Sequence, residues 1–126
     1  MTSQEIRTYA ERQITLPFKV PNLFVGLAEG EGLAKVSFSE LALEFVVKDN
    51  VLKVFKTGLK EIRIPRSELD VIRLKQGWFK DKICIRVKSM RWVADLPGCD
   101  SGELTLHVAR RNRVQAKDFV EMLAPA

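Results

Sequence analysis

Apolar and polar residues alternate along the middle of this chain, the pattern of strands with one buried face and one solvent-facing side. The segment KICIRVKS (residues 82–89) shows the alternation most clearly, because charged residues and Cys84 separate Ile83, Ile85 and Val87. Similar patterns predict five further strands, at residues 32–39, 41–48, 60–65, 69–76 and 103–109. Their short connections favour an antiparallel meander, since parallel strands need long crossovers.

The alternation sorts the side chains of these strands into an inward and an outward set. The side chains expected to face a core are Leu41, Leu43, Phe45, Val47, Ile62, Ile64, Ile72, Leu74, Ile83, Ile85, Leu104, Leu106 and Val108. Those expected to face solvent include Arg63, Arg73, Lys75, Arg86 and Lys88. The sheet should therefore bury an aliphatic face and expose a cationic one.

Near residue 111 the spacing of apolar residues changes from two to that of a helix. The residues that form one apolar stripe at i, i+3, i+4 and i+7 are Ala116, Phe119, Val120 and Leu123. Asn112 and Gln115 suit the first turn of this helix, and Pro125 marks its end. We predict one helix that covers an open end or face of a curved sheet.

Residues 1–28 differ from the rest and are predicted to form an N-terminal arm. SQEIRTYAERQ (residues 3–13) is compatible with a short helix, and residues 16–27 form an apolar, extended stretch that contains Pro17 and Pro21. The apolar side chains of such an arm must pack against another surface. We favour an edge strand on its own barrel over exchange with a neighbouring copy, and Phe18 and Phe24 are its candidate interface residues.

The composition is that of a soluble globular domain, with 126 residues, 46% hydrophobic and 29% charged. No apolar run is long enough to span a membrane, and the first thirty residues lack the pattern of a secretory signal, so we expect a cytoplasmic protein without a transmembrane segment. Cys84 and Cys99 have no metal-ligand spacing, and we expect both to be free thiols.

The net charge of +5 comes from the middle of the chain. Residues 48–91 contain thirteen Lys and Arg against five Asp and Glu, a local charge of +8, while the two flanking parts are neutral to slightly acidic. A binding role for the positive charge would therefore belong to the predicted strands between residues 60 and 89.

The predicted strands and helix carry four short sequence features in a recognisable order. They are the strand end IRIP (residues 62–65), the lead SEL (67–69) into the next strand, the hairpin GWF (77–79) and the helix pattern R-x-x-A-x-x-F-V (113–120). Together they resemble a bacterial pleckstrin-homology-like (PH-like) domain of uncharacterised function, over roughly residues 30–124.

The resemblance implies a mainly β fold, in which residues 29–126 form a partly open antiparallel β-barrel of about six to seven strands closed by one C-terminal α-helix. It also implies a binding or assembly module without catalysis, although this fold serves lipids, peptides and self-association alike. Members that bind phosphoinositides carry several bases in the first hairpin. Here that hairpin contains Ser39 and Glu40 with only Lys35 nearby, so that lipid site is not carried over.

Trp78 and Phe79 lie at the expected tip of a hairpin and are flanked by Lys75, Lys80 and Lys82. We favour an interpretation in which one or both rings fold back over the barrel, because adjacent residues of a strand face opposite ways. The alternatives are a self-association surface and, as a further possibility, contact with an anionic membrane.

Two groups of cations are candidate ligand- or anion-binding residues. One follows the outer face and the hairpin, and comprises Arg73, Lys75, Lys80, Lys82, Arg86 and Lys88. We do not expect nucleic-acid binding there, because exposed aromatics do not alternate with these cations along the strands. The other group is Arg110, Arg111 and Arg113 at the start of the helix, where we favour a carboxylate of this chain, such as Asp118 or an acid in a neighbouring loop, over a bound phosphate.

Catalytic signatures are weak in this sequence. His107 is the only histidine and is predicted on the solvent side of its strand, and we interpret Cys84 as a structural thiol rather than a reactive one. We therefore expect a protein that is not an enzyme, needs no cofactor and no metal, and binds itself or another protein. The alternative function is peripheral binding to anionic surfaces through the basic middle region and the hairpin.

Overall fold

The computed structural model describes residues 13–23, 26–52, 59–94, 96 and 102–123. The strands are β1 (Ile14–Leu23), β2 (Ala28–Val36), β3 (Glu40–Asp49), β4 (Lys60–Pro65), β5 (Leu69–Lys75), β6 (Lys80–Val87) and β7 (Glu103–Ala109). Three short 3-10 helices, η1 (Arg66–Glu68), η2 (Met90–Trp92) and η3 (Arg110–Asn112), and the helix α2 (Arg113–Leu123) complete the described elements. The predicted N-terminal helix, Phe24, Cys99 and Pro125 lie outside the described residues.

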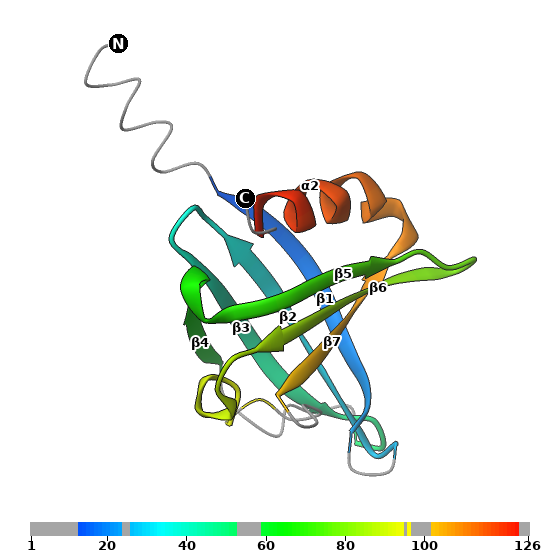
Figure 1. Cartoon of the computed structure of the whole chain (residues 1–126). Coiled ribbons are helices and arrows are strands. Elements are labelled where there is room, and N and C mark those ends of the chain that lie inside the picture. The colour runs from blue at the N-terminus through cyan, green and yellow to red at the C-terminus, as the bar shows by residue number, and fades with distance from the viewer. Residues whose placement is uncertain (1–12, 24–25, 53–58, 95, 97–101, 124–126) are drawn as a thin grey trace.

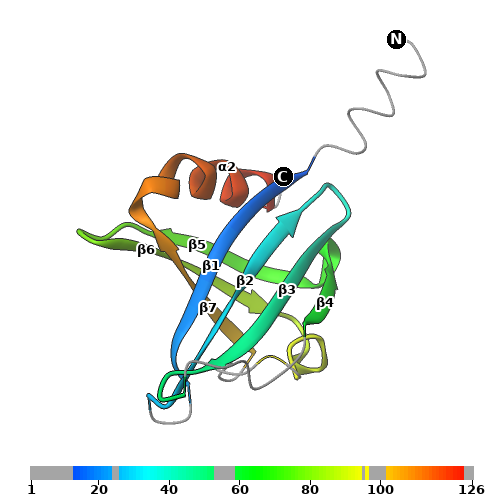
Figure 2. The ribbon, with the colours of Figure 1, turned by 180° about the vertical axis from the view of Figure 1, so that it is seen from behind.

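The seven strands form one antiparallel sheet in the order β4-β3-β2-β1-β7-β6-β5. The sheet curves round into a barrel that stays open between its edge strands β4 and β5, and α2 lies across one end of it (Figure 1; Figure 2). The predicted fold class is therefore confirmed: the protein is mainly β, a partly open antiparallel barrel with a closing C-terminal helix.

The first strand was predicted wrongly as an edge segment. β1 lies inside the sheet, between β2 and β7. It pairs with β2 along most of its length but with β7 only through Lys19 and His107. Pro17 and Pro21 lie two residues before and after Lys19 and have no backbone N–H to donate. This limits the hydrogen bonds between β1 and β7 on either side of Lys19.

The core has the side chains that the alternation assigned to it. Every predicted inward residue of β3, β6 and β7 is buried, and Ile62, Ile72 and Leu74 are partly buried against the core. The predicted cationic residues of β4, β5 and β6 are exposed. The side chain of Phe18, a predicted interface residue, is buried in the core with its β1 neighbours Leu16 and Val20.

Candidate functional site

The β5–β6 hairpin extends beyond the wall of the barrel, beside the start of α2 (Figure 1). Its tip, residues 76–79, joins Lys75 of β5 to Lys80 of β6 and is exposed throughout. The exposed fractions of Trp78 and Phe79 are 85% and 93%. The favoured prediction, that a ring folds back over the barrel, is therefore wrong. The tip is a turn rather than a strand, so the alternation of a strand does not apply to it.

The inward position nearest the tip belongs to Asp81, which is 0% exposed. Asp81 continues the inward series of Ile83 and Ile85 two residues further toward the tip. Arg113 donates to it through two hydrogen bonds, Nε to Oδ2 at 2.9 Å and Nη2 to Oδ1 at 2.8 Å. The backbone N–H of Gly77 donates to Oδ1 at 3.2 Å. A buried carboxylate thus joins the hairpin to the helix, and every one of these bonds favours its charged form.

The electrostatics of Asp81 agree with this geometry. The hydrogen bond from Arg113 lowers the pKa of Asp81 below its ordinary value, and the bond from Gly77 acts in the same direction, while burial opposes both. The same hydrogen bond raises the pKa of Arg113. The pair therefore stays ionised at neutral pH.

Two further hydrogen bonds fix the backbone of the tip itself. Arg113 Nη2 donates to the carbonyl oxygen of Gly77 at 2.7 Å, and Arg110 Nη1 donates to the carbonyl oxygen of Trp78 at 2.9 Å. We call Asp81, Arg110 and Arg113 the clamp. Arg110 and Arg113, two of the three arginines predicted to bind an anion, therefore bind groups of this chain, and the carboxylate that accepts from Arg113 is Asp81 rather than Asp118.

Lysines surround the aromatic tip. Lys75 and Lys82 are cross-strand partners, Lys80 follows Phe79, and all three side chains are exposed. Among the described residues no ion pair joins any of these lysines to an acid. The tip thus presents two aromatic rings flanked by Lys75, Lys80 and Lys82, which we call the lysine collar.

The predicted basic face further along the sheet is partly neutralised. Arg63 forms ion pairs with Glu40 and Glu61, and Arg86 lies 3.3 Å from Glu103. Acids therefore interrupt a continuous track of cations along the strands, which argues against a phosphate-binding surface there. Beside Arg86, Cys84 is a buried free thiol at the base of a hollow of about 300 Å³.

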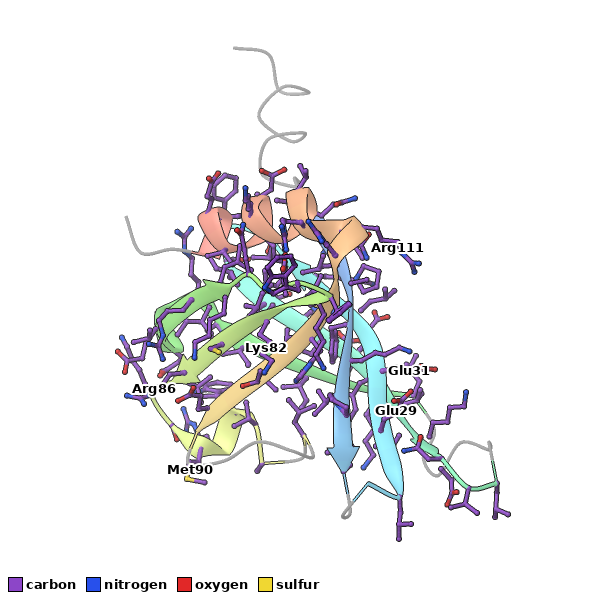
Figure 3. All side chains as sticks on the ribbon, turned by 90° about the vertical axis from the view of Figure 1, so that its right-hand side faces the viewer. Glu29, Glu31, Lys82, Arg86, Met90 and Arg111 are labelled. Atoms are coloured by element: carbon purple, nitrogen blue, oxygen red, sulfur yellow. The ribbon has the colours of Figure 1, made fainter. Side chains whose placement is uncertain are left out.

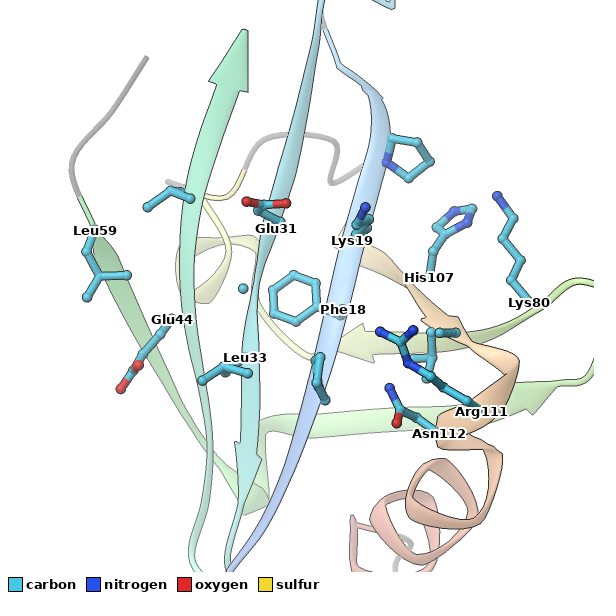
Figure 4. A pocket seen from close by; sticks show the side chains of 16 residues that line it. Phe18, Lys19, Glu31, Leu33, Glu44, Leu59, Lys80, His107, Arg111 and Asn112 are labelled. Atoms are coloured by element: carbon cyan, nitrogen blue, oxygen red, sulfur yellow. The ribbon is translucent and has the colours of Figure 1, made fainter. Parts of the chain in front are cut away.

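An open groove of about 710 Å³ lies on the outer side of β1, β2 and β3 and reaches β7 and η3. We call it the outer groove. Its apolar lining includes Pro17, Pro21, Leu33, Val46 and Leu59. Glu31 and Glu44 lie on one side of it, and Lys19, Lys80 and Arg111 on the other (Figure 4). No sequence motif marks this groove, because its lining comes from six separate elements and from the loop residue before β4. Arg111, the third predicted anion-binding arginine, belongs to it.

His107 also lines the outer groove and is partly buried, although we predicted a surface histidine. Burial lowers its pKa from 6.5 to about 4, and the nearby charges of Lys80 and Lys82 act in the same direction. Its Nδ1 atom is buried and has no hydrogen-bond partner among the residues that the structure describes. The imidazole is therefore neutral over most of the physiological pH range.

We expect His107 to make the fold less stable in acid. Between pH 6.5 and about 4 the unfolded chain binds a proton that the folded chain excludes, so the free energy of unfolding falls as the pH falls through this window. Because the side chain is partly exposed and screened, we expect a loss of about 1 kcal/mol. Denaturant titrations of the wild type and His107→Gln at pH 7, 5.5 and 4.5 measure the difference. If the free energy of unfolding depends on pH in the same way in both proteins, the lowered pKa of His107 is contradicted.

The described residues contain no group of His, Cys, Asp and Glu side chains that could hold a metal ion. None of the helices described is long and apolar enough to cross a membrane. No family model, no curated protein and no solved structure matches the chain.

Proposed function

We propose that this protein is a non-catalytic binding and self-assembly module of the PH-like type, whose docking element is the hairpin tip. One observation carries the proposal: Trp78 and Phe79 are almost fully exposed on a hairpin whose backbone the clamp holds in place. Soluble proteins seldom expose two adjacent large aromatic side chains without a binding partner. The order of strands and the closing helix agree with the PH-like resemblance.

The clamp supports a binding role because it removes much of the entropic cost of docking. A mobile loop must be ordered when it binds, and each ordered side chain or segment reduces the affinity. Here the tip accepts hydrogen bonds from Arg110 and Arg113 on the neighbouring helical segment. Tryptophan and other aromatic residues also dominate the binding energy of protein interfaces. A protein partner, including a second copy, therefore fits the tip best.

The proposal predicts that the tip controls self-association. We expect the wild type to exceed its monomer mass of 14.3 kDa in light scattering at micromolar concentration, and Trp78→Ser/Phe79→Ser to remain monomeric. The matched control is Val51→Ser/Leu52→Ser, which removes two exposed apolar side chains after β3 and should leave the mass unchanged. Equal association of the wild type and the tip variant would contradict a docking role for the tip.

Peripheral binding to anionic membranes is a second candidate, and the collar of Lys75, Lys80 and Lys82 favours it. Aromatic side chains suit the headgroup region, and each cation near an acidic surface contributes about 1 kcal/mol. Sedimentation with vesicles that contain phosphatidylserine, compared with neutral vesicles, separates this function from self-association. Equal recovery of the wild type and the tip variant with both kinds of vesicle would exclude it.

A further inference from the structure

We infer that the outer groove of one copy receives the hairpin tip of a second copy, so that two chains exchange tips reciprocally. The inference rests on the proposed function and adds the partner and its receptor site. It starts from the presence, in one chain, of both a projecting aromatic element and an apolar groove of about 710 Å³. The tip and the groove are both already formed in a single chain, so docking needs no rearrangement of the fold.

The tip and the groove both present apolar side chains to solvent. Trp78 and Phe79 project from the tip, while Leu33 and Leu59 in the groove remain 37% and 71% exposed. The outward positions of β1 in the groove are Pro17, Lys19 and Pro21, and the two proline rings add rigid apolar surface to it. Docking of the rings would therefore remove apolar surface from water on both partners.

The area is also adequate for a stable dimer. A buried aromatic side chain covers about 150–250 Å², so four rings in two tips bury roughly 600–1,000 Å². They cover a comparable area of the two grooves, which gives a total of roughly 1,200–2,000 Å², the size of a standard specific interface. A single tip in a single groove would give only half of this area.

The acidic side of the groove suits the lysines of the incoming tip, while the opposite side of the groove is cationic. Glu31 and Glu44 lie on the β2 and β3 side of the groove (Figure 4), and the lysine collar belongs to the β5–β6 hairpin, on which Figure 3 marks Lys82. Glu44 already pairs with Lys35 at 2.7 Å, whereas Glu31 has no ion pair among the described residues. Lys75 or Lys82 of the second copy can therefore meet Glu31. On the opposite side, Arg111 is placed to contact the face of an aromatic ring.

The positions of the tip and the groove favour a closed pair. Lys80 follows the tip directly and also lines the groove, so the two surfaces are neighbours on each chain. When a projecting element and its receptor are adjacent, a twofold axis can satisfy both contacts at once. Contacts that did not close in this way would propagate into filaments.

The test is complementation between two variants with different defects. Trp78→Ser/Phe79→Ser lacks the tip, and Leu33→Glu places a charge in the apolar groove. We expect each variant alone to raise the dimer dissociation constant at least about a hundredfold, since several central interface side chains are lost. An equimolar mixture should associate more strongly than either variant alone and more weakly than the wild type, because only one contact is restored: the intact tip of the groove variant enters the intact groove of the tip variant. Glu31→Lys is a second groove variant, and melting curves check that each variant folds.

The outcomes separate this inference from the proposed function. A groove variant that dimerises like the wild type, or a mixture that associates no more strongly than either variant alone, would overturn tip exchange while the docking role of the tip stands. A wild type that is monomeric at all concentrations would also overturn it, and vesicle binding would then decide the function of the tip. Association that survives in the tip variant would overturn both.

Discussion

Replacing Phe119 with alanine is expected to lower the free energy of unfolding by about 3–5 kcal/mol, the usual cost of removing a buried aromatic side chain. Phe119 is fully buried, and α2 places it against the open end of the barrel together with Ala116 and Leu123. The helix should therefore be part of the cooperative fold rather than an appendage. Denaturant titration followed by tryptophan fluorescence and far-ultraviolet circular dichroism measures the change.

The matched control lies on the same helix. Val114 is exposed, so Val114→Ala should change the free energy of unfolding by no more than about 0.5 kcal/mol. A loss of less than 1 kcal/mol for Phe119→Ala would show that α2 does not close the barrel as described.

Replacing Gly32 with alanine is the second large effect that we expect. A Cβ atom at Gly32 would overlap the backbone carbonyl of Glu44 on the neighbouring strand β3. Backbone cannot move aside as a flexible side chain can, so the register of β2 and β3 must shift locally. We expect a loss of about 1–3 kcal/mol, the range for overpacked interiors. Thermal melts and denaturant titrations measure it.

Gly30 supplies the control, two residues away on the same strand. A Cβ atom there would lie 3.6 Å from the side chains of Leu23 and Val20, an ordinary contact distance. Gly30→Ala should therefore have little effect or stabilise the strand slightly, because alanine loses less conformational entropy than glycine. If both substitutions lower the free energy of unfolding by the same amount, β2 and β3 do not approach each other as closely at Gly32 as described.

Much of the barrel could be predicted from local patterns. Alternation located β4 and β7 at their observed bounds, and it placed β3, β5 and β6 within two residues. The stripe of Ala116, Phe119 and Leu123 located the closing helix. These signals are reliable because each strand buries one face and the helix buries one stripe, so the sequence directly records which side meets the core.

Other parts of the fold depend on pairing that local patterns do not record. β2 begins at Ala28, four residues before the predicted start, because Gly30 and Gly32 interrupt the alternation with residues more typical of turns. The extended stretch that contains Pro17 and Pro21 was predicted as an edge strand. Prolines are tolerated in the interior here because β1 pairs with β7 only at Lys19.

The candidate site was predicted in part. Trp78 and Phe79 were correctly placed on a hairpin, but their exposure depends on the clamp, which joins residues that are 32 positions apart in the sequence. Extending the alternation of β6 by two residues would have found Asp81 as a buried acid in need of a cation. The outer groove carries no such signal, since a groove between strands arises only from their tertiary arrangement.

The pairing of Lys19 with His107 has a consequence for how the barrel forms. The β1–β4 meander contains mostly local contacts and can assemble early, whereas β1 must wait for a strand 88 positions later in the chain. Such a high contact order slows folding, since the entropy of a long loop is lost before the contact is gained. During synthesis, the β7-facing side of β1 therefore remains unpaired until β7 has left the ribosome, which leaves the half-formed barrel open to association with other chains.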